Sequence, residues 1–435
     1  MHKFGIIADD LTGANDSGVQ LVKQGLRTSV MFDVIPITDV PIKHDAVVID
    51  TDSRAVRPEK AYQAVHRAAM FLKEHNFTQI YKKVDSTLRG NLGAEIQAVT
   101  DVFEPEFCII VPAFPRIGRT TIQGTHFLHG VRITETEIAH DPQSPVVQSS
   151  LCRLLESQSS QHVGLVQTKE LGQDIPLWRA ELEKWQHQGV KWLVFDAETD
   201  AHLEWIAFCV SKITTNVVWV GSAGLAEYLP TMLGWQQVST QQPANMQSHR
   251  VLTVSGSLSS VTSQQIAKLI KKNDIQAIEL DPMSVFAETT QWERKKQELI
   301  CQLSKVYAQG DHAVLYVAAS PENRLSTQHA TSQLRLTPAE VSKRISQGLG
   351  QIASQLVKNE PYVSGLVLTG GDTAKDVCRQ IGVSGLELIR EVEAGIPLGK
   401  LTAGDLALFA ITKAGAFGHE NSLVNAVNEL KGGAS

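Results

Sequence analysis

Short apolar runs recur along the chain and alternate with longer segments of helical periodicity. The short runs are rich in β-branched residues and predict strands, whereas the longer amphipathic segments predict helices. This alternation is typical of βα units on a mainly parallel sheet flanked by helices. In the first half, the predicted strands cover residues 4–8, 28–32, 46–50, 79–83, 108–112, 163–167, 192–196 and 217–221. In the second half they cover residues 251–255, 276–280, 314–318, 365–369 and 406–412, with a long helix over 338–358.

One polar segment, residues 236–249, interrupts this alternation and has neither helical nor strand periodicity. A chain of 435 residues is too long for one ordinary core, which favours about two to three domains. We therefore predict an α/β protein of two domains, residues 1–235 and 250–435, joined by a linker over 236–249. Each domain is expected to contain a mainly parallel sheet flanked by helices, with a cleft between the domains.

Composition and net charge limit the kinds of molecule that this protein is expected to bind. The net charge is -6, which argues against a nucleic-acid or anionic-membrane surface, since both favour basic proteins. Five scattered cysteines without a C-x-x-C pair indicate neither a disulfide framework nor a zinc site. The N-terminal apolar run is too short for a signal sequence, and no run reaches transmembrane length. We expect a cytoplasmic protein that binds small molecules, and a homodimer is left open.

Polar residues follow several predicted strands of the first half, where α/β sheets bind ligands. Asp9 and Asp10 follow the first strand, Arg54 follows the third, and Lys83 ends the fourth, directly before Val84 and Asp85. Such cations suit an anionic substrate, and carboxylates suit its hydroxyls. Two plainer interpretations stay open: the aspartates are helix-start residues, or the cluster consists of ordinary surface ion pairs.

Glycine-rich turns follow three predicted strands of the second half. They contain Ser257, the run Gly370, Gly371, Asp372 and Thr373, and the segment from Lys413 to Gly415. Backbone amides at such turns, backed by a helix N-terminus, favour phosphate oxygens, as a nucleotide requires. Asp372 would repel phosphate unless a metal intervened, which suggests a Mg²⁺-linked role. Ordinary helix–sheet packing is the plainer alternative for any one turn.

Two standard nucleotide motifs are missing. The nearest match to a P-loop, Gly395–Lys400, is one residue short and lacks the hydroxyl residue, and no G-x-G-x-x-G occurs.

Other segments of the first half have more than one interpretation. The segment 118–150 is a hairpin or a loop over a site, and His126 and His129 within it are structural or substrate-edge residues. Some residues after later strands could either bind a ligand or serve only in turns and packing: Arg116, Arg119, Gly221, Ser222 and Gly224.

Seven motifs, in this order, resemble the four-carbon acid sugar kinase family: IADDLTGANDSG, KKVDSTLRGN, PAFPRIGRT, VGSAGLAEYL, VSGSLSS, VLTGGDTA and ITKAGAFG. The resemblance covers nearly the whole chain, and the first motif is more similar to the D-threonate kinases than to the erythronate or 3-oxo-tetronate kinases. It implies an N-terminal sugar-acid domain and a C-terminal nucleotide domain. ATP would then phosphorylate the terminal hydroxyl of a four-carbon sugar acid to give a 4-phosphate.

Carried onto matching positions, the resemblance implies two sets of contacts. The substrate contacts are Asp9, Arg54, Lys82, Lys83, Val84 and Asp85, and Asp10 stands beside them. The ATP contacts are Ser257, Gly370, Gly371, Asp372, Thr373 and Gly415. A cation among Arg54, Lys82 and Lys83 would clamp the substrate carboxylate. Asp85 and Asp372 are rival candidates for the base that takes the proton from the attacking hydroxyl, and Asp372 is also the candidate Mg²⁺ ligand.

Two other classes remain as alternatives. An aspartate-nucleophile phosphatase would use the aspartates after the first strand, although that class wants D-x-D rather than D-D and leaves the glycine-rich half without a purpose. A non-catalytic sugar-acid sensor would use the same cleft without phosphoryl transfer.

Overall fold

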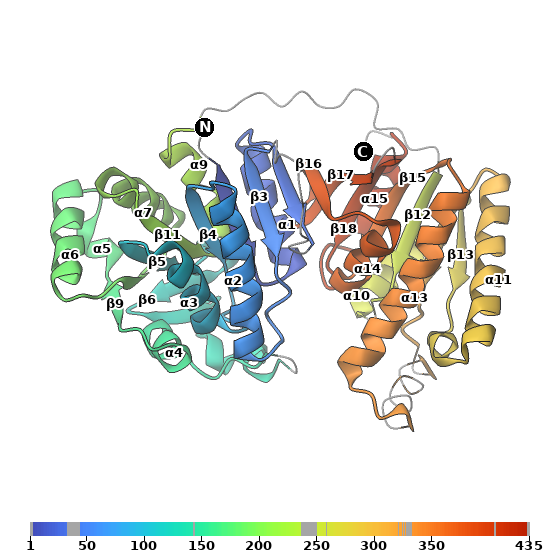
Figure 1. Cartoon of the computed structure of the whole chain (residues 1–435), viewed down its shortest axis with the longest axis horizontal. Coiled ribbons are helices and arrows are strands. Elements are labelled where there is room, and N and C mark those ends of the chain that lie inside the picture. Colours follow the sequence, from blue (N-terminus) through green and yellow to red (C-terminus); the bar gives the residue numbers. More distant parts are fainter. Residues whose placement is uncertain are drawn as a thin grey trace. The chain divides into compact units, whose positions relative to one another are not determined.

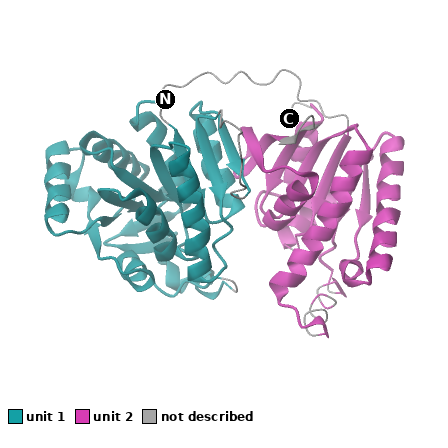
Figure 2. Cartoon of the chain, viewed as in Figure 1, with its two compact units in different colours: residues 1–240 teal, residues 241–435 magenta. Residues whose placement is uncertain are grey.

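The computed structural model describes residues 3–32, 44–141, 144–235, 250–257, 259–320, 322–323, 325, 327, 333–403 and 406–432. The chain forms two compact units, Met1–Thr240 and Gln241–Ser435 (Figure 2). The predicted linker, residues 236–249, lies outside the described residues. Among the described residues, no helix combines the length and apolar character that membrane crossing requires.

The first unit is built on a parallel sheet of strand order β2-β3-β1-β4-β11-β5-β10-β9. The strands are β1 (Phe4–Ala8), β2 (Thr28–Met31), β3 (Ala46–Asp50), β4 (Gln79–Lys83), β5 (Phe107–Val111), β9 (Val163–Val166), β10 (Trp192–Phe195) and β11 (Val217–Gly221). The register pairs Ala8 with Asp50 on one side and with Lys83 on the other. Residues that follow these three strands therefore leave the sheet at one edge.

Helices cover both faces of this sheet. They are α1 (Leu11–Lys23), α2 (Pro58–Glu74), α3 (Leu92–Phe103), α4 (Leu151–Gln158), α5 (Thr168–Leu171), α6 (Ile175–His187), α7 (Asp200–Ile213), α8 (Ala223–Ala226) and α9 (Leu229–Met232). Helices α2, α3 and α4 lie on one face of this sheet (Figure 1), and their buried residues form one cluster with alternate strand residues. The chain runs from β1 to β2 in one direction along the sheet and from β3 to β4 in the other. Right-handed crossovers then place α1 and α2 on opposite faces.

The segment whose conformation was left open contains a small antiparallel sheet. Its strands are β6 (Arg119–Ile122), β7 (Thr125–Leu128) and β8 (Val131–Arg132), and it contains the short helical turns η2 (Ile133–Glu135) and η3 (Glu137–His140). The turn η1 (Pro115–Ile117) directly precedes it. The Asp196 carboxylate, just past β10, accepts hydrogen bonds from the backbone N–H groups of Gln123 at 2.7 Å and Gly124 at 2.9 Å. The β6–β7 turn is thus fixed to the edge of the main sheet.

The second unit contains the strand order β13-β14-β12-β15-β18-β17-β16. The strands are β12 (Arg250–Ser255), β13 (Ile275–Glu279), β14 (His312–Tyr316), β15 (Val363–Thr369), β16 (Gly385–Glu393), β17 (Ile396–Ala403) and β18 (Leu406–Lys413). The first five in spatial order are parallel, whereas β16 and β17 form an antiparallel hairpin. This hairpin was not predicted, because Pro397 and Gly399 interrupt the strand pattern of β17.

Helices also cover both faces of the second sheet. They are α10 (Ser260–Leu269), α11 (Thr289–Ala308), α13 (Pro338–Asn359), α14 (Gly371–Ile381) and α15 (Ser422–Leu430), with a short turn η4 (Pro282–Phe286). Residues of α10 and α15 pack in one apolar cluster against the strands. Helix α13 begins with a capping box between Thr337 and Glu340, a strong N-terminal signal that explains why its start was predicted correctly.

The predicted fold class is confirmed: the chain is α/β, and each unit has a mainly parallel sheet with helices on both faces. The cleft expected between the two domains stays a prediction. The near-match to a P-loop lies in the β16–β17 hairpin, where Gly395 forms the turn at a φ of 74°. A P-loop requires a strand, a loop and a helix in succession, so this segment is not one.

Candidate functional site

The first cluster lies where β1 and β3 end, and Arg54 is at its centre. Its Nε donates to Asp9 Oδ2 at 2.7 Å and its Nη2 to Asp9 Oδ1 at 3.1 Å. The same guanidinium donates to both oxygens of Asp10 at 2.8 Å. The Asp10 Oδ1 atom also accepts the Gly13 N–H at 2.8 Å and so caps α1. Asp10 is therefore a helix-start residue and a member of the cluster at once.

The two aspartates have different electrostatic surroundings. Burial opposes ionisation of Asp9, which is 2% exposed, but the charges of Arg54 and Lys82 outweigh it and lower the pKa of Asp9. For Asp10, burial dominates over the attraction of Arg54, and the pKa is raised. The adjacent negative charge of Asp9 adds to this rise. One positive guanidinium thus holds two neighbouring carboxyl groups with unequal proton affinity.

The two lysines at the end of β4 point to different surroundings. Lys82 is fully buried, and its Nζ forms an ion pair with Glu95 Oε2 at 2.7 Å. Lys83 is 4% exposed, and within the described part of the chain its ammonium makes no ion pair or hydrogen bond. Its Nζ lies 2.7 Å from where a Cβ on Gly13 would stand, so the absence of a side chain at Gly13 makes room for it. A buried cation of this kind suits an anionic ligand.

Asp85 belongs to a second group of charges beside the first. Its Oδ2 accepts from Arg89 Nε and from Thr87 Oγ1, both at 2.5 Å. Burial works against ionisation, yet Arg54 and Arg89 outweigh it and hold the pKa of Asp85 well below its usual range. The neighbouring Val84 side chain is buried in the apolar cluster, and its N–H donates to the Gly221 carbonyl at 2.9 Å.

Residues that sequence reasoning did not select hold this cluster in place. Asn91 Nδ2 donates to the carbonyls of Ser53 at 3.0 Å and Val56 at 2.9 Å, on either side of Arg54. The buried Glu95 neutralises Lys82, as described above. Asn91 is the last residue of the motif KKVDSTLRGN and the N-cap of α3, and Glu95 lies in the first turn of this helix. Their positions at the end of the motif and directly after it are the sequence signal that could have identified them.

His126 also supports the site. Its Nδ1 lies 3.0 Å from Thr121 Oγ1 and its Nε2 lies 2.9 Å from the Ser86 carbonyl, so Nε2 is the protonated nitrogen. Burial lowers the pKa of His126 to about 4. The histidine is therefore neutral near pH 7 and fastens the small antiparallel sheet to the loop that contains Asp85. This favours the structural interpretation of His126.

The remaining open residues of the first unit have structural partners. Arg116 is exposed and pairs with Asp200 at 3.1 Å and Glu227 at 3.2 Å. A Cβ on Gly221 would stand 2.5 Å from the Tyr81 hydroxyl, and the Gly224 N–H is already bonded to the Ser222 hydroxyl. Close packing thus accounts for these glycines, and the four-residue helix α8 offers no extended N-terminus.

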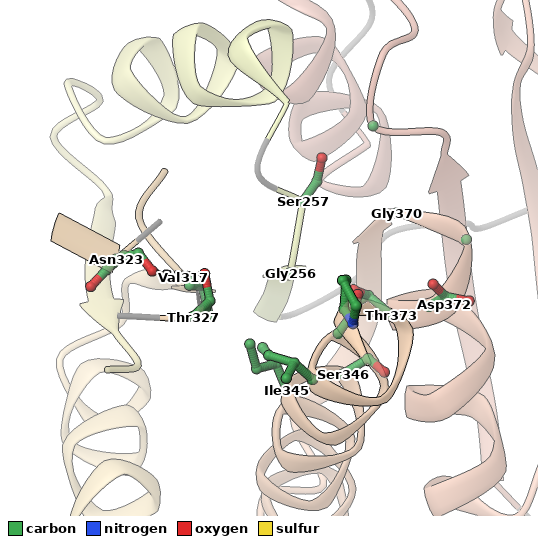
Figure 3. Close-up of a pocket in the computed structure, with 15 residues that line it drawn as sticks. Gly256, Ser257, Val317, Asn323, Thr327, Ile345, Ser346, Gly370, Asp372 and Thr373 are labelled. Carbon is green, nitrogen blue, oxygen red and sulfur yellow. Dashed lines mark hydrogen bonds between the residues drawn. The ribbon is translucent and has the colours of Figure 1, made fainter. Parts of the chain in front are cut away.

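The second unit has a pocket of about 380 Å³ at the carboxyl ends of its strands. Figure 3 shows Asn323 and Thr327 on one side and Asp372 and Thr373 on the other, with Ser257 nearby. The complete lining is Gly256, Ser257, Val317, Asn323, Thr327, Pro338, Val341, Ser342, Ile345, Ser346, Gly370, Gly371, Asp372, Thr373 and Gly415. All the predicted ATP contacts therefore line one pocket. The sequence predicted α13 as a long helix but assigned none of its residues to the pocket.

The glycines of this pocket give it a geometry that is suited to phosphate groups. Gly370 has a φ of 100°, which a residue with a side chain adopts only with strain, and it begins α14 without a side-chain cap. Because the N-cap residue has no side chain, it places none over the amides at the start of α14, where the helix dipole favours negative charge. A Cβ on Gly415 would stand 2.3 Å from Ser257 Oγ, so these two loops meet only because residue 415 is glycine.

The residues that line this pocket fit a nucleotide that carries Mg²⁺. Among the described residues, no cluster of three or more His, Cys, Asp or Glu side chains is placed to hold a metal alone. Mg²⁺ at nucleotide sites is commonly held by one or two carboxylates together with phosphates and water. Asp372 lies in the first turn of α14, beside the proposed phosphate amides, where such a shared site would form.

Comparisons with known proteins place this architecture in a class. A model for a sugar-binding N-terminal domain matches residues 4–229, and one for a nucleotide-binding C-terminal domain matches residues 252–423. A D-threonate kinase of Salmonella typhimurium is 31% identical, covering 98% of this chain and 97% of the relative. A D-erythronate kinase of Heliobacterium modesticaldum is also 31% identical, covering 99% and 97%. The chain belongs to the four-carbon acid sugar kinase family, which confirms the resemblance and the kinase class.

Other comparisons agree with this assignment. A 3-oxo-tetronate kinase of Haemophilus influenzae is 29% identical, covering 96% of this chain and 97% of the relative. A solved structure of a Salmonella typhimurium protein superposes with a TM-score of 0.81 at 26% identity, covering 99% of this chain and 100% of that chain. The α/β architecture is therefore shared over the full length.

Proposed function

We propose that this protein uses ATP to phosphorylate the terminal hydroxyl of a four-carbon sugar acid, converting D-threonate to 4-phospho-D-threonate. One observation carries the proposal. The first unit gathers buried cations and carboxylates suited to a hydroxylated anion, while the second has a glycine-lined pocket suited to phosphates. A kinase needs both ligands at once.

The carboxylate of the sugar acid binds Lys83 in this proposal. The sequence left three candidates for the clamp, and two of them already have partners. Arg54 is bonded to both Asp9 and Asp10, and Lys82 is paired with Glu95. Lys83 is buried and is the candidate without an ion pair among the described residues. Asp9 and Asp10, held by Arg54, accept hydrogen bonds from the sugar hydroxyls.

Asp372 is the stronger candidate for the base. A general base works best when its pKa is not far below the working pH. The pKa of Asp85 is held low by the cations around it, which suits a group that accepts hydrogen bonds but rarely takes a proton. Asp85 is then a positioning residue that orients the sugar acid together with Arg89.

The nucleotide binds through Ser257, the Gly370–Thr373 turn and Gly415. When bound, Mg²⁺·ATP supplies the phosphoryl group, with the metal neutralising charge on the phosphates. The amides at the start of α14 would hold the phosphate oxygens, and Gly370 and Gly415 permit the close approach of the backbone. Asp372 would act on the metal through a water molecule, which leaves its carboxylate able to take the proton. Transfer requires the γ-phosphate and the sugar hydroxyl to meet, so the proposal requires both sites to be filled in one complex.

The alternatives fit the geometry less well. A phosphatase nucleophile needs an uncommitted carboxylate oxygen, yet both oxygens of Asp9 accept from Arg54. A sensor would have no use for the glycine-lined pocket. D-threonate is preferred over D-erythronate and the 3-oxo acids because the first motif is more similar to that branch.

A substrate screen tests this proposal. The value of kcat/KM would be measured from ADP release with D-threonate, D-erythronate, L-threonate and the 3-oxo acids. The proposal predicts the highest value for D-threonate. A higher value for another four-carbon acid would reassign the substrate within the family, and no ADP release with any of them would overturn the proposal.

A further inference from the structure

Lys413, the last residue of β18, has an unusual environment. The side chain is 3% exposed, and its Nζ is surrounded by oxygen atoms of the loop that follows. It donates to the backbone carbonyls of Ala414 at 2.8 Å, Phe417 at 3.2 Å and Gly415 at 3.3 Å. The Thr262 hydroxyl of α10 lies at 3.4 Å. The ammonium thus sits in a cage made mainly of backbone carbonyls.

This cage lacks the partner that a buried lysine usually has. Over the described ranges, no carboxylate forms an ion pair with Lys413. Glu393 on β16 attracts the Lys413 ammonium only at longer range. The carboxylate oxygens of Glu393 instead accept hydrogen bonds from Asn425 Nδ2 at 2.7 Å and from the Ser422 hydroxyl. Several carbonyl oxygens around one positive charge form the environment in which proteins bind weakly hydrated monovalent cations.

The cage is connected to the nucleotide pocket at two points. Gly415 lines the pocket, and its carbonyl is one of the oxygens that face the ammonium. The backbone carbonyl of Lys413 accepts the N–H of Gly370 at 2.9 Å, so the same residue also fixes the start of the α14 turn. Gln265 supports the cage from outside by donating to the carbonyls of Phe417 at 3.0 Å and His419 at 2.8 Å.

We propose that the Lys413 ammonium is a tethered monovalent cation that shapes the nucleotide pocket, and that its removal leaves a site for free K⁺ or NH₄⁺. Lys413 is a positioning residue, since it acts on the nucleotide through Gly415 and Gly370. The inference rests on the proposed nucleotide site. It differs from the sequence-based expectation, in which Lys413 was simply a cation after a strand.

The electrostatics fit this role. Burial lowers the pKa of Lys413 to about 8, and Glu393 opposes the change only in part. A second titratable side chain, His419 of the same loop, places its Nε2 3.5 Å from Glu393. Above pH 8 the lysine loses its proton, so the carbonyls lose their central charge. ATP affinity of the unmodified protein is therefore expected to fall as the pH rises through 8.

The test compares Lys413→Ala with Lys268→Ala, a matched control whose ammonium pairs with Glu420 on the surface. ATP affinity is measured by calorimetry in Na⁺, K⁺ and NH₄⁺ buffers of equal ionic strength. In Na⁺, Lys413→Ala is expected to bind ATP at least about tenfold more weakly, because the carbonyls of the cage lose the charged donor that holds them in place. K⁺ or NH₄⁺ should restore most of this loss, while the control responds to neither ion.

The outcomes separate the inference from the proposed function. If the unmodified protein binds no ATP, the proposed function fails. If it binds ATP and Lys413→Ala is weakened equally in all three buffers, or not at all, the tethered-cation inference is wrong. Should Lys413→Ala fail to fold, the decision falls to the unmodified protein between pH 7 and 9.5. Constant ATP affinity over that range would then contradict the inference, and a loss centred near pH 8 would support it.

Discussion

The guanidinium of Arg54 donates two hydrogen bonds to Asp9 and two to Asp10, and so joins the ends of two neighbouring strands into one charged cluster. The sequence presented Arg54 as a candidate clamp for the substrate. In the structure, its donors hold the carboxyl groups of Asp9 and Asp10, which we propose bind the sugar hydroxyls. Its expected contribution is therefore the placement of Asp9 and Asp10.

Replacing Arg54 by lysine tests this placement. A lysine keeps the charge but cannot bind two carboxylates in the planar, forked manner of arginine. We expect kcat/KM for the sugar acid to fall by about 100-fold, because losing two charge-assisted hydrogen bonds removes about 3 kcal/mol. ATP affinity should not change. Arg27→Lys is the control, since Arg27 makes a similar forked pair with Asp45 at an exposed position.

The roles of Asp85 and Asp372 can be separated by their asparagine variants. If Asp372 is the base, Asp372→Asn should lower kcat by about 100-fold or more at saturating substrates. Asp85→Asn should mainly raise KM for the sugar acid, since an amide still offers one acceptor to Arg89. Steady-state kinetics with each substrate varied in turn distinguish the two. A larger loss of kcat in Asp85→Asn than in Asp372→Asn would reverse the assignment.

Asp85 also predicts how stability depends on pH. Because its pKa is lower in the folded than in the unfolded chain, its charged form stabilises the fold above the unfolded pKa of about 3.9. That contribution is lost as the pH falls through the folded pKa. Thermal unfolding between pH 5 and 2 should show a smaller midpoint decrease for Asp85→Asn than for the unmodified protein, with the difference growing below pH 4. Asp101→Asn, on the exposed part of α3, should follow the unmodified curve.

Gly370 provides a test of the nucleotide pocket. Gly370→Ala places a side chain at a φ of 100°, and Gly382→Ala, at the other end of α14, does so at 90°. Both should lower stability by a similar amount, about 1–2 kcal/mol. Only Gly370→Ala should weaken ATP binding, since Gly382 does not line the pocket. Equal effects on ATP affinity would remove the α14 N-terminus from the site.

Local sequence signals predicted the parts of the fold that depend on them. The parallel strands were apparent because runs such as residues 46–50 and 217–221 are continuous and apolar, and these two strands match their predicted bounds. The β16–β17 hairpin was missed, because its stability comes from pairing with β18 rather than from its own composition. The small sheet β6-β7-β8 likewise depends on distant partners such as Asp196.

For the candidate site too, the sequence predicted which residues gather but not how each side chain is oriented. The positions after strands indicated which side chains gather, because parallel strands end at one edge of a sheet. The sequence did not indicate that Lys82 turns toward Glu95 while Lys83 does not, since the direction of a side chain depends on tertiary packing. The carbonyl cage around Lys413 was equally hidden, because its ligands are backbone atoms that carry no sequence signature.

The most direct test of the proposed function is the product of a single reaction. The protein is incubated with Mg²⁺·ATP and D-threonate, and the product is examined by mass spectrometry and phosphorus NMR. We predict a stoichiometric gain of one phosphoryl group on the terminal hydroxyl, with loss of product in the absence of either substrate. Unchanged D-threonate, or phosphate released without a phosphorylated acid, would contradict the proposal.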